Sequence, residues 1–345
     1  MHHVVSTLQS TWPPFVLVAG LLLIGHIASS EGLFKQLGSW CGRAPGGAHG
    51  MFFVTMAVVA LVTAVLNLDT SVVFMTPVAL QAARSKGVDE TAFLFGTIFM
   101  SNSASLLLPG SNLTNLLVWS HRRASGATFA SHMAWPWIVS ISVTALVVGV
   151  WRWRALGRPA RPVSTDSSFK VGPGLVAVLC AVVAMLMLSN PAPWVFAIGV
   201  LIEIVTLGRR RVTLTSVLSA VNARTLGALF LIAVGIGAVA RATTVSAHLL
   251  HHTSALVTAA VASGAALVIN NLPAASLFAA RGVTHPIALL LGLDLGPNIF
   301  VTGALSSLLW LRIARQNDSH PSILTFARVG AVIAVATLAC SLALI

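Results

Sequence analysis

Long apolar runs alternate with short polar segments along the whole chain. Six of these runs approach the roughly 20 apolar residues that a helix needs to cross a bilayer. They lie near residues 13–29, 133–151, 174–190, 191–207, 225–241 and 322–345. Pro191 and Pro193 separate the third run from the fourth, so residues 171–202 are predicted to form two helices joined by a tight turn. The pattern therefore predicts an all-α polytopic membrane protein.

Four further apolar stretches are interrupted by polar residues. They are residues 51–84, 91–120, 253–281 and 285–312, with interruptions at 67–70 and 77, at 101–103 and 109–112, at 270–273, and at 294–298, respectively. Their Asn, Asp, Ser, Gly and Pro residues free backbone groups that lipid cannot satisfy. Such backbone is tolerated at membrane depth only when it is buried in protein or lines a cavity. The breaks are therefore expected to lie inside the protein.

The order of these stretches suggests an internal symmetry. Residues 51–84 and 253–281 are interpreted as re-entrant helical hairpins, and each is followed by a discontinuous transmembrane helix. Five crossings separate the hairpins, so they are expected to enter from opposite faces. This predicts two inverted repeats, residues 1–151 and 191–345, with a basic linker and a connecting helix over 152–190 between them. Such repeats are typical of secondary transporters, whose site lies at the midplane.

Composition supports a membrane protein and excludes several other classes. Only 8% of the residues are charged, 57% are hydrophobic, and the mean hydropathy is +0.91. Soluble domains carry about 25% charged residues, so a soluble enzyme, a disordered chain and a secreted disulfide scaffold are excluded. The 20 Lys and Arg outnumber the 8 Asp and Glu, an excess that in membrane proteins marks cytoplasmic loops. The expected partner is therefore the lipid bilayer and not nucleic acid.

The positions of the basic residues predict an orientation. If the N-terminus is outside and each hairpin returns to its own side, the cytoplasmic segments are residues 31–50, 84–90, 152–173, 208–224 and 312–328. They hold sixteen of the twenty Lys and Arg, and only Arg122, Arg123, Arg241 and Arg281 fall elsewhere. The positive-inside rule supports this arrangement. It places the protein in the cell inner (plasma) membrane with both termini outside.

Two acids lie in the breaks of the apolar stretches, Asp69 and Asp294. A charge at the bilayer centre costs about 2.5–3.5 kcal/mol, so it usually marks a pathway or a relay. A partly desolvated carboxylate at a break could exchange protons with a passing solute, or it could cap the half-helix that follows. The two roles are compatible. Both acids are predicted to be proton-coupling residues.

The breaks also hold neutral hydrogen-bonding side chains, which form the predicted substrate-binding set. These are Asn67, Thr70, Ser71, Asn102, Ser103, Ser105, Ser111, Asn112, Asn115, Asn270, Asn271, Asn298 and Thr302. They suit a neutral polyhydroxyl or weakly charged solute, and about half are expected only to satisfy freed backbone groups. No Lys or Arg lies in a break, so an anion would have to rely on helix N-termini.

Other polar residues have simpler interpretations. Glu203 lies on an unbroken helix near Arg209, Arg210 and Arg211, which favours a snorkelling ion pair. The histidines His248, His251 and His252, like His2, His3 and His26, are expected at the surface because no carboxylate or cysteine accompanies them. Cys41, Cys180 and Cys340 are far apart, and no catalytic motif is present. No metal site, cofactor or enzymatic activity is therefore predicted.

The four breaks carry a resemblance to a known family. Residues 66–70 with 76–77, 103–106 with 111–115, 270–273, and 293–298 continuing through Gly303 to 308–311 resemble the arsenite efflux permeases (ArsB-type) of the ion transporter superfamily. Citrate, dicarboxylate and silicon transporters are relatives in that superfamily. The resemblance implies two inverted repeats, with the solute between the hairpin tips and the unwound segments. It also implies proton-driven export of trihydroxy-arsenic(III) or antimonite, with Asp69 and Asp294 at acidic positions of the motifs.

The chain departs from the arsenite permeases in two places. Those permeases begin about two scaffold helices earlier, which bears on dimerisation more than on transport, and a homodimer stays an open expectation. The first tip reads Asn67-Leu68-Asp69 where the family usually has Asn and Asp adjacent, which re-aims the carboxylate. The leading prediction is a proton-coupled antiporter that exports arsenite-like or antimonite-like hydroxides and confers arsenical resistance. A sodium- or proton-coupled carboxylate or inorganic-anion transporter and a non-transporting scaffold remain as alternatives.

Overall fold

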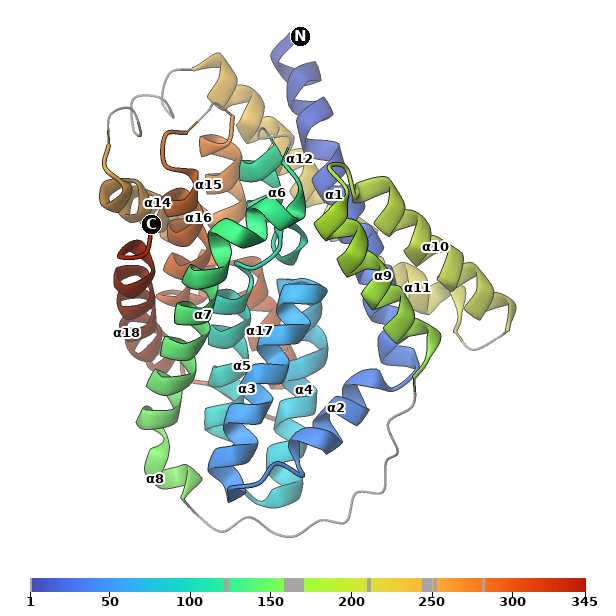
Figure 1. Cartoon of the computed structure of the whole chain (residues 1–345), viewed down its shortest axis with the longest axis vertical. Coiled ribbons are helices and arrows are strands. Elements are labelled where there is room, and N and C mark those ends of the chain that lie inside the picture. The colour runs from blue at the N-terminus through green and yellow to red at the C-terminus, as the bar shows by residue number, and fades with distance from the viewer. Residues whose placement is uncertain are drawn as a thin grey trace.

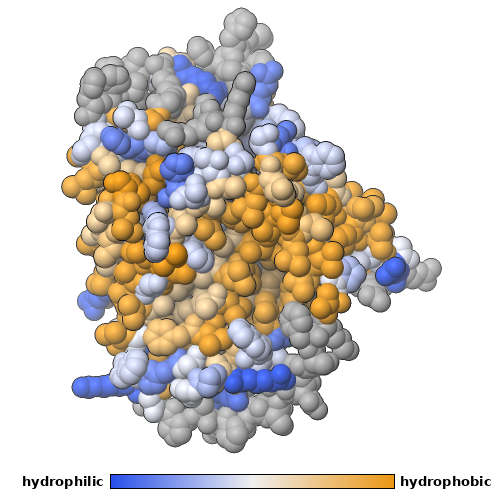
Figure 2. Space-filling view, viewed as in Figure 1, coloured by the Kyte–Doolittle hydropathy of each residue, from blue (hydrophilic) through white to orange (hydrophobic). Residues whose placement is uncertain are grey.

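The computed structural model describes residues 2–120, 124–157, 171–209, 212–243, 250, 253–280 and 283–345, with only the backbone described for 2–6. Within these ranges every regular element is a helix. Figure 2 shows a broad apolar belt around the molecule between two hydrophilic bands, as expected for a membrane-embedded protein. The side chains of His2 and His3, and residues His248, His251, His252, Arg122, Arg123, Arg210, Arg211 and Arg281, lie outside the described part.

Uninterrupted helices form where the six apolar runs predict them. These are α1 (His2–Ser30), α7 (Gly126–Trp151), α9 (Pro173–Met187), α10 (Ala192–Gly208), α12 (Ala223–Ala242) and α18 (Ile323–Leu342). The predicted turn at Pro191 is confirmed, since α9 ends at Met187 and α10 begins at Ala192. Short helices complete the connections: α2 (Leu33–Cys41), α8 (Trp153–Leu156) and α11 (Leu214–Val221).

Five helical spans among the described residues, one of them formed by α11 and α12 together, have the length and composition needed to cross a membrane. They are Thr7–Ser30, Gly47–Val65, Gly126–Trp151, Leu214–Ala242 and Ile323–Leu342. In Figure 1, α9, α10 and α11 lie on one side of the molecule, against α1, and the other helices form the larger body. The close packing of α1 on α10 depends on glycine, because an added Cβ at Gly20 would lie 2.7 Å from the Cα of Phe196.

Two helical hairpins enter the molecule from opposite ends, so the first starts and ends at one end and the second starts and ends at the other (Figure 1). The first consists of α3 (Gly47–Val65) and α4 (Leu68–Lys86), and the second of α14 (Ala255–Ile269) and α15 (Asn271–Phe278). In the first, Nε2 of His49 lies 3.1 Å from the carbonyl oxygen of Trp153, and Arg84 near the end of α4 donates to Ser319 at 2.8 Å. In the second, Arg241 before the hairpin donates to the carbonyl oxygen of Ala280 after it.

Contacts at the end where the first hairpin starts bring together segments that are expected to share one face. Glu31 accepts a hydrogen bond from the amide of Gly174 at 2.7 Å. Arg152 forms an ion pair with Asp89 at 2.7 Å, and Arg84 forms one with Glu90. The second hairpin starts at the other end, where Arg241 donates to Ser10 of α1 at 3.0 Å. These contacts bring segments near residues 31, 84–90 and 152 together, and the face of the membrane on which they lie stays a prediction.

Each hairpin is followed by a broken helix. The first comprises α5 (Glu90–Ala104), η1 (Pro109–Ser111) and α6 (Leu113–Trp119). The second comprises α16 (Pro286–Leu295), η3 (Gly296–Asn298), η4 (Val301–Gly303) and α17 (Leu305–Gln316). Both helices unwind close to the predicted breaks at 109–112 and 294–298.

Two predicted interruptions were wrong. Pro77 lies inside α4, and residues 101–103 stay helical within α5. The polar side chains of 101–103 do not mark freed backbone, because they bond to neighbouring helices instead. Ser101 contacts Ser71 of α4, and Ser103 contacts Thr144 of α7.

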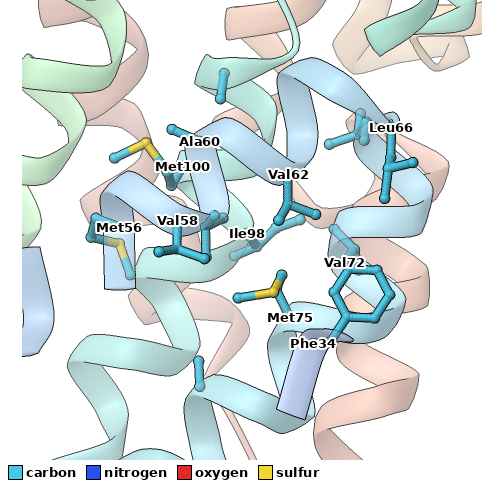
Figure 3. Packing of buried hydrophobic residues seen from close by; sticks show 14 of the residues in the cluster. Phe34, Met56, Val58, Ala60, Val62, Leu66, Val72, Met75, Ile98 and Met100 are labelled. Carbon is cyan, nitrogen blue, oxygen red and sulfur yellow. The ribbon is translucent and has the colours of Figure 1, made fainter. Parts of the chain in front are cut away.

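The first hairpin is held in place by apolar packing against α5. Figure 3 shows Val62 of α3, Met75 and Val72 of α4, and Ile98 of α5 within one buried cluster. Met75, Val72 and Ile98 are fully buried, and Val62 is 7% exposed. This packing fixes the position of the hairpin tip at residues 66–69, inside the molecule.

Candidate functional site

Both hairpin tips and the starts of the second halves of both broken helices meet at one small cavity of about 30 Å³. Its lining consists of Leu68, Asp69, Asn112, Leu113, Leu229, Asn271, Leu272, Ala304, Leu305 and Ser306. Apart from Leu229 of α12, these residues are the caps or first residues of α4, α6, α15 and α17. The N-terminal ends of four helices therefore point at one place, contributed by both hairpins and both broken helices.

Asparagine side chains start three of these helices. Oδ1 of Asn67 accepts from the amide of Thr70 at 2.7 Å, which caps α4. Asn112 caps α6 in the same way, and Asn270 caps α15. Asn270 also has a φ of 73°, a left-handed conformation that asparagine tolerates better than most residues. Each cap satisfies a backbone N–H that would otherwise be stranded in an apolar environment.

Asp69 lies on the cavity wall in the first turn of α4. Its side chain is half-buried, and no described side chain forms a hydrogen bond or an ion pair with it. A negative charge in the first turn is favoured by the positive end of the helix dipole. Asp69 is therefore the acid that a solute in this cavity would meet directly.

Asp294 lies behind the cavity wall and is 2% exposed. Its Oδ1 accepts hydrogen bonds from Nδ2 of Asn112 at 3.0 Å and from Oγ1 of Thr114 at 2.5 Å. Its Oδ2 is buried without a hydrogen-bond partner among the described residues. The two predicted acids thus occupy different positions, one on the wall and one linked to it through Asn112.

A second set of polar side chains joins the two broken helices beside the cavity. Asn102 donates to Oδ1 of Asn298 at 2.8 Å and accepts from the hydroxyl of Ser306 at 3.4 Å. Ser306 itself lines the cavity. Nδ2 of Asn298 is buried and has no acceptor among the described residues. Asn102 and Asn298 therefore support the wall and do not form it.

Several members of the predicted binding set instead satisfy freed backbone groups of the first break. Ser111 donates to the carbonyl oxygens of Ser105 and Leu108, both at 2.5 Å. Asn115 donates to the same two carbonyl oxygens at 2.7 and 3.3 Å. The hydroxyl of Ser105 donates to the carbonyl oxygen of Asn102. This is the structural role expected for part of the set.

The remaining members point away from the cavity. Ser71 and Ser103 contact Ser101 and Thr144, as described above. Thr70 faces α1, where its methyl carbon would lie 2.7 Å from a Cβ added at Gly25. Asn270 donates to the carbonyl oxygen of Thr302 at 3.0 Å, and Thr302 is exposed. Of the predicted set and the two acids, the cavity lining includes Asp69, Asn112 and Asn271.

Eight side chains of the site were not in the predicted set, and five of them, Leu68, Leu113, Leu272, Ala304 and Leu305, are apolar wall residues beside the predicted polar ones. The other three are Thr114, Ser306 and Leu229. Thr114 donates to Asp294, and Ser306 and Leu229 line the cavity. Thr114 lies between two predicted residues, Asn112 and Asn115, so its motif position was the available signal. Ser306 follows the second break closely, whereas nothing in the apolar run of α12 distinguishes Leu229 from its neighbours.

Glu203 lies outside this site, and the ion pair expected for it was wrong. Its Oε1 is 2.7 Å from Nδ1 of His26, because α10 packs along α1. Arg209 lies exposed at the end of α10. His26, expected at the surface, is only 14% exposed in its side chain. No group of three or more His, Cys, Asp and Glu that could hold a metal occurs in the described part of the chain.

Comparison with known proteins identifies the family. A family model described as citrate transporter (CitMHS) matches residues 3–305. The chain belongs to this citrate transporter family. An uncharacterised transporter of Mycobacterium tuberculosis is 26% identical over 364 residues, covering 95% of this chain and 84% of the relative. A 46 kDa membrane protein of Mycobacterium leprae is 24% identical over 366 residues, with the same two coverages.

A solved structure shares the fold of this transporter family member. The crystal structure of the YdaH transporter of Alcanivorax borkumensis aligns with a TM-score of 0.62 at 14% identity, covering 99% of this chain and 86% of that one. The family match agrees with the resemblance at the level of the ion transporter superfamily. It is a match to citrate transporters and does not single out the arsenite permeases.

Proposed function

We propose that the protein is a proton-coupled secondary transporter of a small carboxylate or a similarly small anion. The observation that carries this proposal is the meeting of both hairpin tips and both unwound segments at one cavity. Discontinuous helices that expose their ends near the midplane are where secondary transporters bind solutes. Membership of the citrate transporter family supports a carboxylate.

The electrostatics of the cavity favour an anion without a basic side chain. Among the described lining residues none is Lys, Arg or His. The N-terminal ends of α4, α15 and α17, each of eight or more residues, face the cavity instead. Helix N-termini bind anions because their first N–H groups are free and the helix dipole is positive there. Asn112, Asn271 and Ser306 add neutral donors.

Asp69 supplies the coupling to protons. An anion in the cavity would lie beside its carboxylate, and two like charges in one small low-dielectric space repel strongly. Solute and proton therefore bind together, so the proton gradient drives anion symport. Protonation of Asp294 alters the hydrogen bond of 3.0 Å that it accepts from Asn112, and so alters the position of Asn112 on the cavity wall.

Solute binding requires the cavity to widen. Its volume of about 30 Å³ is close to the share of one water molecule in the liquid. The hairpin tips must move apart from the unwound segments for a carboxylate to fit. We attribute this movement to alternating access between two inverted repeats, residues 1–151 and 191–345, with the loops around 31–50 and 84–90 in the cytoplasm.

Export of an arsenite-like hydroxide is the second candidate. It is favoured by the neutral amide and hydroxyl groups on the wall and by the small size of the cavity. A neutral hydroxide does not repel a carboxylate, so proton and solute would bind in alternation. The two candidates therefore differ in the direction of transport relative to the proton. An anion moves with the proton, and a neutral hydroxide moves in the opposite direction.

Reconstituted protein in liposomes tests the proposal. Labelled citrate, smaller carboxylates, sulfate and arsenite are offered under a pH gradient of either direction, with and without sodium. The proposal predicts carboxylate uptake when the outside is acidic, and no need for sodium. Arsenite movement that is faster toward the acidic side would favour the second candidate. If no solute moves faster than in protein-free liposomes, the transport proposal is wrong.

A further inference from the structure

A second and much larger cavity opens at the end of the molecule where α1 begins. Its volume is about 610 Å³, within the range of ligand sites, which are roughly 300–1,000 Å³. Its walls are the first part of α1, the turn between α9 and α10, residues of η1 and α6 in the first broken helix, and the start of α7. We call this cavity the vestibule.

The vestibule and the central cavity share one wall. Pro109 lines the vestibule, while Asn112 and Leu113, only three and four residues later, line the central cavity. Further along α6, Leu116 and Trp119 line the vestibule again. The start of α6 therefore borders the central cavity, while η1 and the later residues of α6 border the vestibule.

The flexible side chain of Met185 packs against Gly110, on the segment that borders both cavities. Met185 and Leu17 both line the vestibule. A Cβ added at Gly110 of η1 would lie 2.4 Å from Sδ of Met185 and 3.0 Å from Cδ2 of Leu17. Met185 therefore rests directly on the backbone of the break. Methionine is unbranched and changes rotamer easily, so this contact can open without moving a helix.

The chemistry of the vestibule suits passage and not tight binding. Gln9, Ser189 and Asn190 contribute neutral amide and hydroxyl groups. None of the described residues that line the vestibule is charged. Such walls replace part of the hydration of a small carboxylate or hydroxide, but they offer no counter-charge that would retain it.

We propose that the vestibule is the route by which the solute reaches the central cavity from this end, and that Met185 over Gly110 is its closure. This inference rests on the proposed transport function for the identity of the solute. The route does not depend on which solute is transported, so it can be tested without any transported solute.

The test uses single cysteines as probes in the full-length protein. Exposed Cys180 and Cys340 are replaced by Ala, and buried Cys41 is kept. Leu113→Cys places a thiol on the wall of the central cavity, and Leu229→Cys is a second such position if the first variant does not fold. A small, membrane-impermeant thiosulfonate is added in proteoliposomes, and the modification rate is followed by mass spectrometry.

Two manipulations of the vestibule should change that rate. Met185→Ala should raise it several-fold, because the closure opens. Attaching a bulky maleimide to Ser189→Cys beforehand should lower it several-fold, because the vestibule is filled. Ser131→Cys, exposed on α7 and outside the vestibule, carries the same maleimide as the control and should leave the rate unchanged.

The outcomes separate this inference from the proposed function. The vestibule is not the route if the modification rate at the central cavity is unchanged by both Met185→Ala and the modified Ser189→Cys. The same conclusion follows if no labelling occurs even with Met185→Ala. If labelling follows the vestibule but no solute is transported, the route stands and the proposed function fails.

Discussion

Asn112 joins the two broken helices by donating a hydrogen bond from Nδ2 to Oδ1 of Asp294 at 3.0 Å, although the two residues are 182 positions apart. The same asparagine caps α6 with its Oδ1 and lines the central cavity. One side chain therefore contacts the solute space, a helix N-terminus and a buried acid. A change in the charge of Asp294 must alter the hydrogen bonds that position Asn112 on the wall.

Thr114 is predicted to support this linkage through its hydroxyl, which donates to Asp294 at 2.5 Å. Thr114→Val keeps the side-chain volume and removes the donor. A hydrogen bond to a charged group is worth about 1.5–3 kcal/mol, so the transport rate should fall about 10- to 100-fold. Thr114→Ser keeps the hydroxyl and should stay near the wild-type rate. Equal initial rates for the Val and Ser variants under a pH gradient would rule out this role.

The pair of His26 and Glu203 is predicted to hold α1 against α10. Glu203 is 3% exposed, and its described partner is Nδ1 of His26 at 2.7 Å. His26→Leu leaves a buried carboxylate without its partner, which costs about 3–5 kcal/mol. Replacing both residues by Leu should recover most of that loss, because no polar group is then stranded.

Thermal unfolding of the single and double variants in detergent measures this coupling. The expected result is a large coupling energy between the two positions. Additive losses, with the double variant less stable than either single variant, would show that the contact has no energetic role.

Gly20, where α1 and α10 come closest, is predicted to be a position at which any side chain destabilises the protein. A Cβ there would lie 2.7–2.8 Å from backbone atoms of Val195 and Phe196, so the helices would have to separate. Gly20→Ala should destabilise by about 1–3 kcal/mol. Gly235→Ala on α12, with nothing within 4 Å of its added Cβ, is the matched control. It should be neutral or should stabilise by about 1 kcal/mol through helix propensity. Equal melting temperatures for the two variants would contradict this prediction.

Three helix starts at the breaks could be predicted because their polar residues are costly in an apolar environment. Asn67, Asn112 and Asn270 stand out within apolar runs, and each caps a helix in the structure. A helix cap is a local feature, set by residues two or three positions apart. The starts of these three helices could therefore be predicted from the chain alone, whereas Asn102 and Ser103, which are equally polar, stay inside α5.

Which side chains reach the cavity could not be predicted, because that depends on how separate helices face one another. Asn102 and Ser103 are adjacent on α5, yet one bonds to Asn298 and the other to Thr144 of α7. Asp69 and Asp294 looked equivalent in the sequence, but only Asp69 lies on the wall. The partner of Glu203 likewise depends on the packing of α1 against α10, which no local pattern specifies.

The ion pair of Asp89 and Arg152 is predicted to stabilise the protein at neutral pH but not in acid. Burial raises the pKa of the Asp89 carboxyl, but the hydrogen bond and charge of Arg152, with the amide of Thr91, outweigh this and lower its pKa below the usual value. The stabilisation is therefore present at neutral pH and is lost as pH falls through this lowered pKa, below about pH 4.

Asp89→Asn tests this prediction, since asparagine can still cap α5. The variant should lose about 1 kcal/mol of unfolding free energy at pH 7. The difference from wild type should shrink below about pH 4, where the wild-type carboxyl is also uncharged. A difference that stays constant from pH 7 to pH 3 would assign the loss to something other than charge.

Asp69→Asn is the most direct test of proton coupling at the central cavity. The amide imitates the protonated acid, so solute should still exchange across the membrane in counterflow without any gradient. Net uptake driven by a pH gradient should be lost, because no proton can be released at this position. Asp318→Asn, at an exposed position with a left-handed φ of 57° that suits asparagine, is the matched control and should keep both activities. The account predicts counterflow without pH-driven uptake for Asp69→Asn, and pH-driven uptake at the wild-type rate would contradict it.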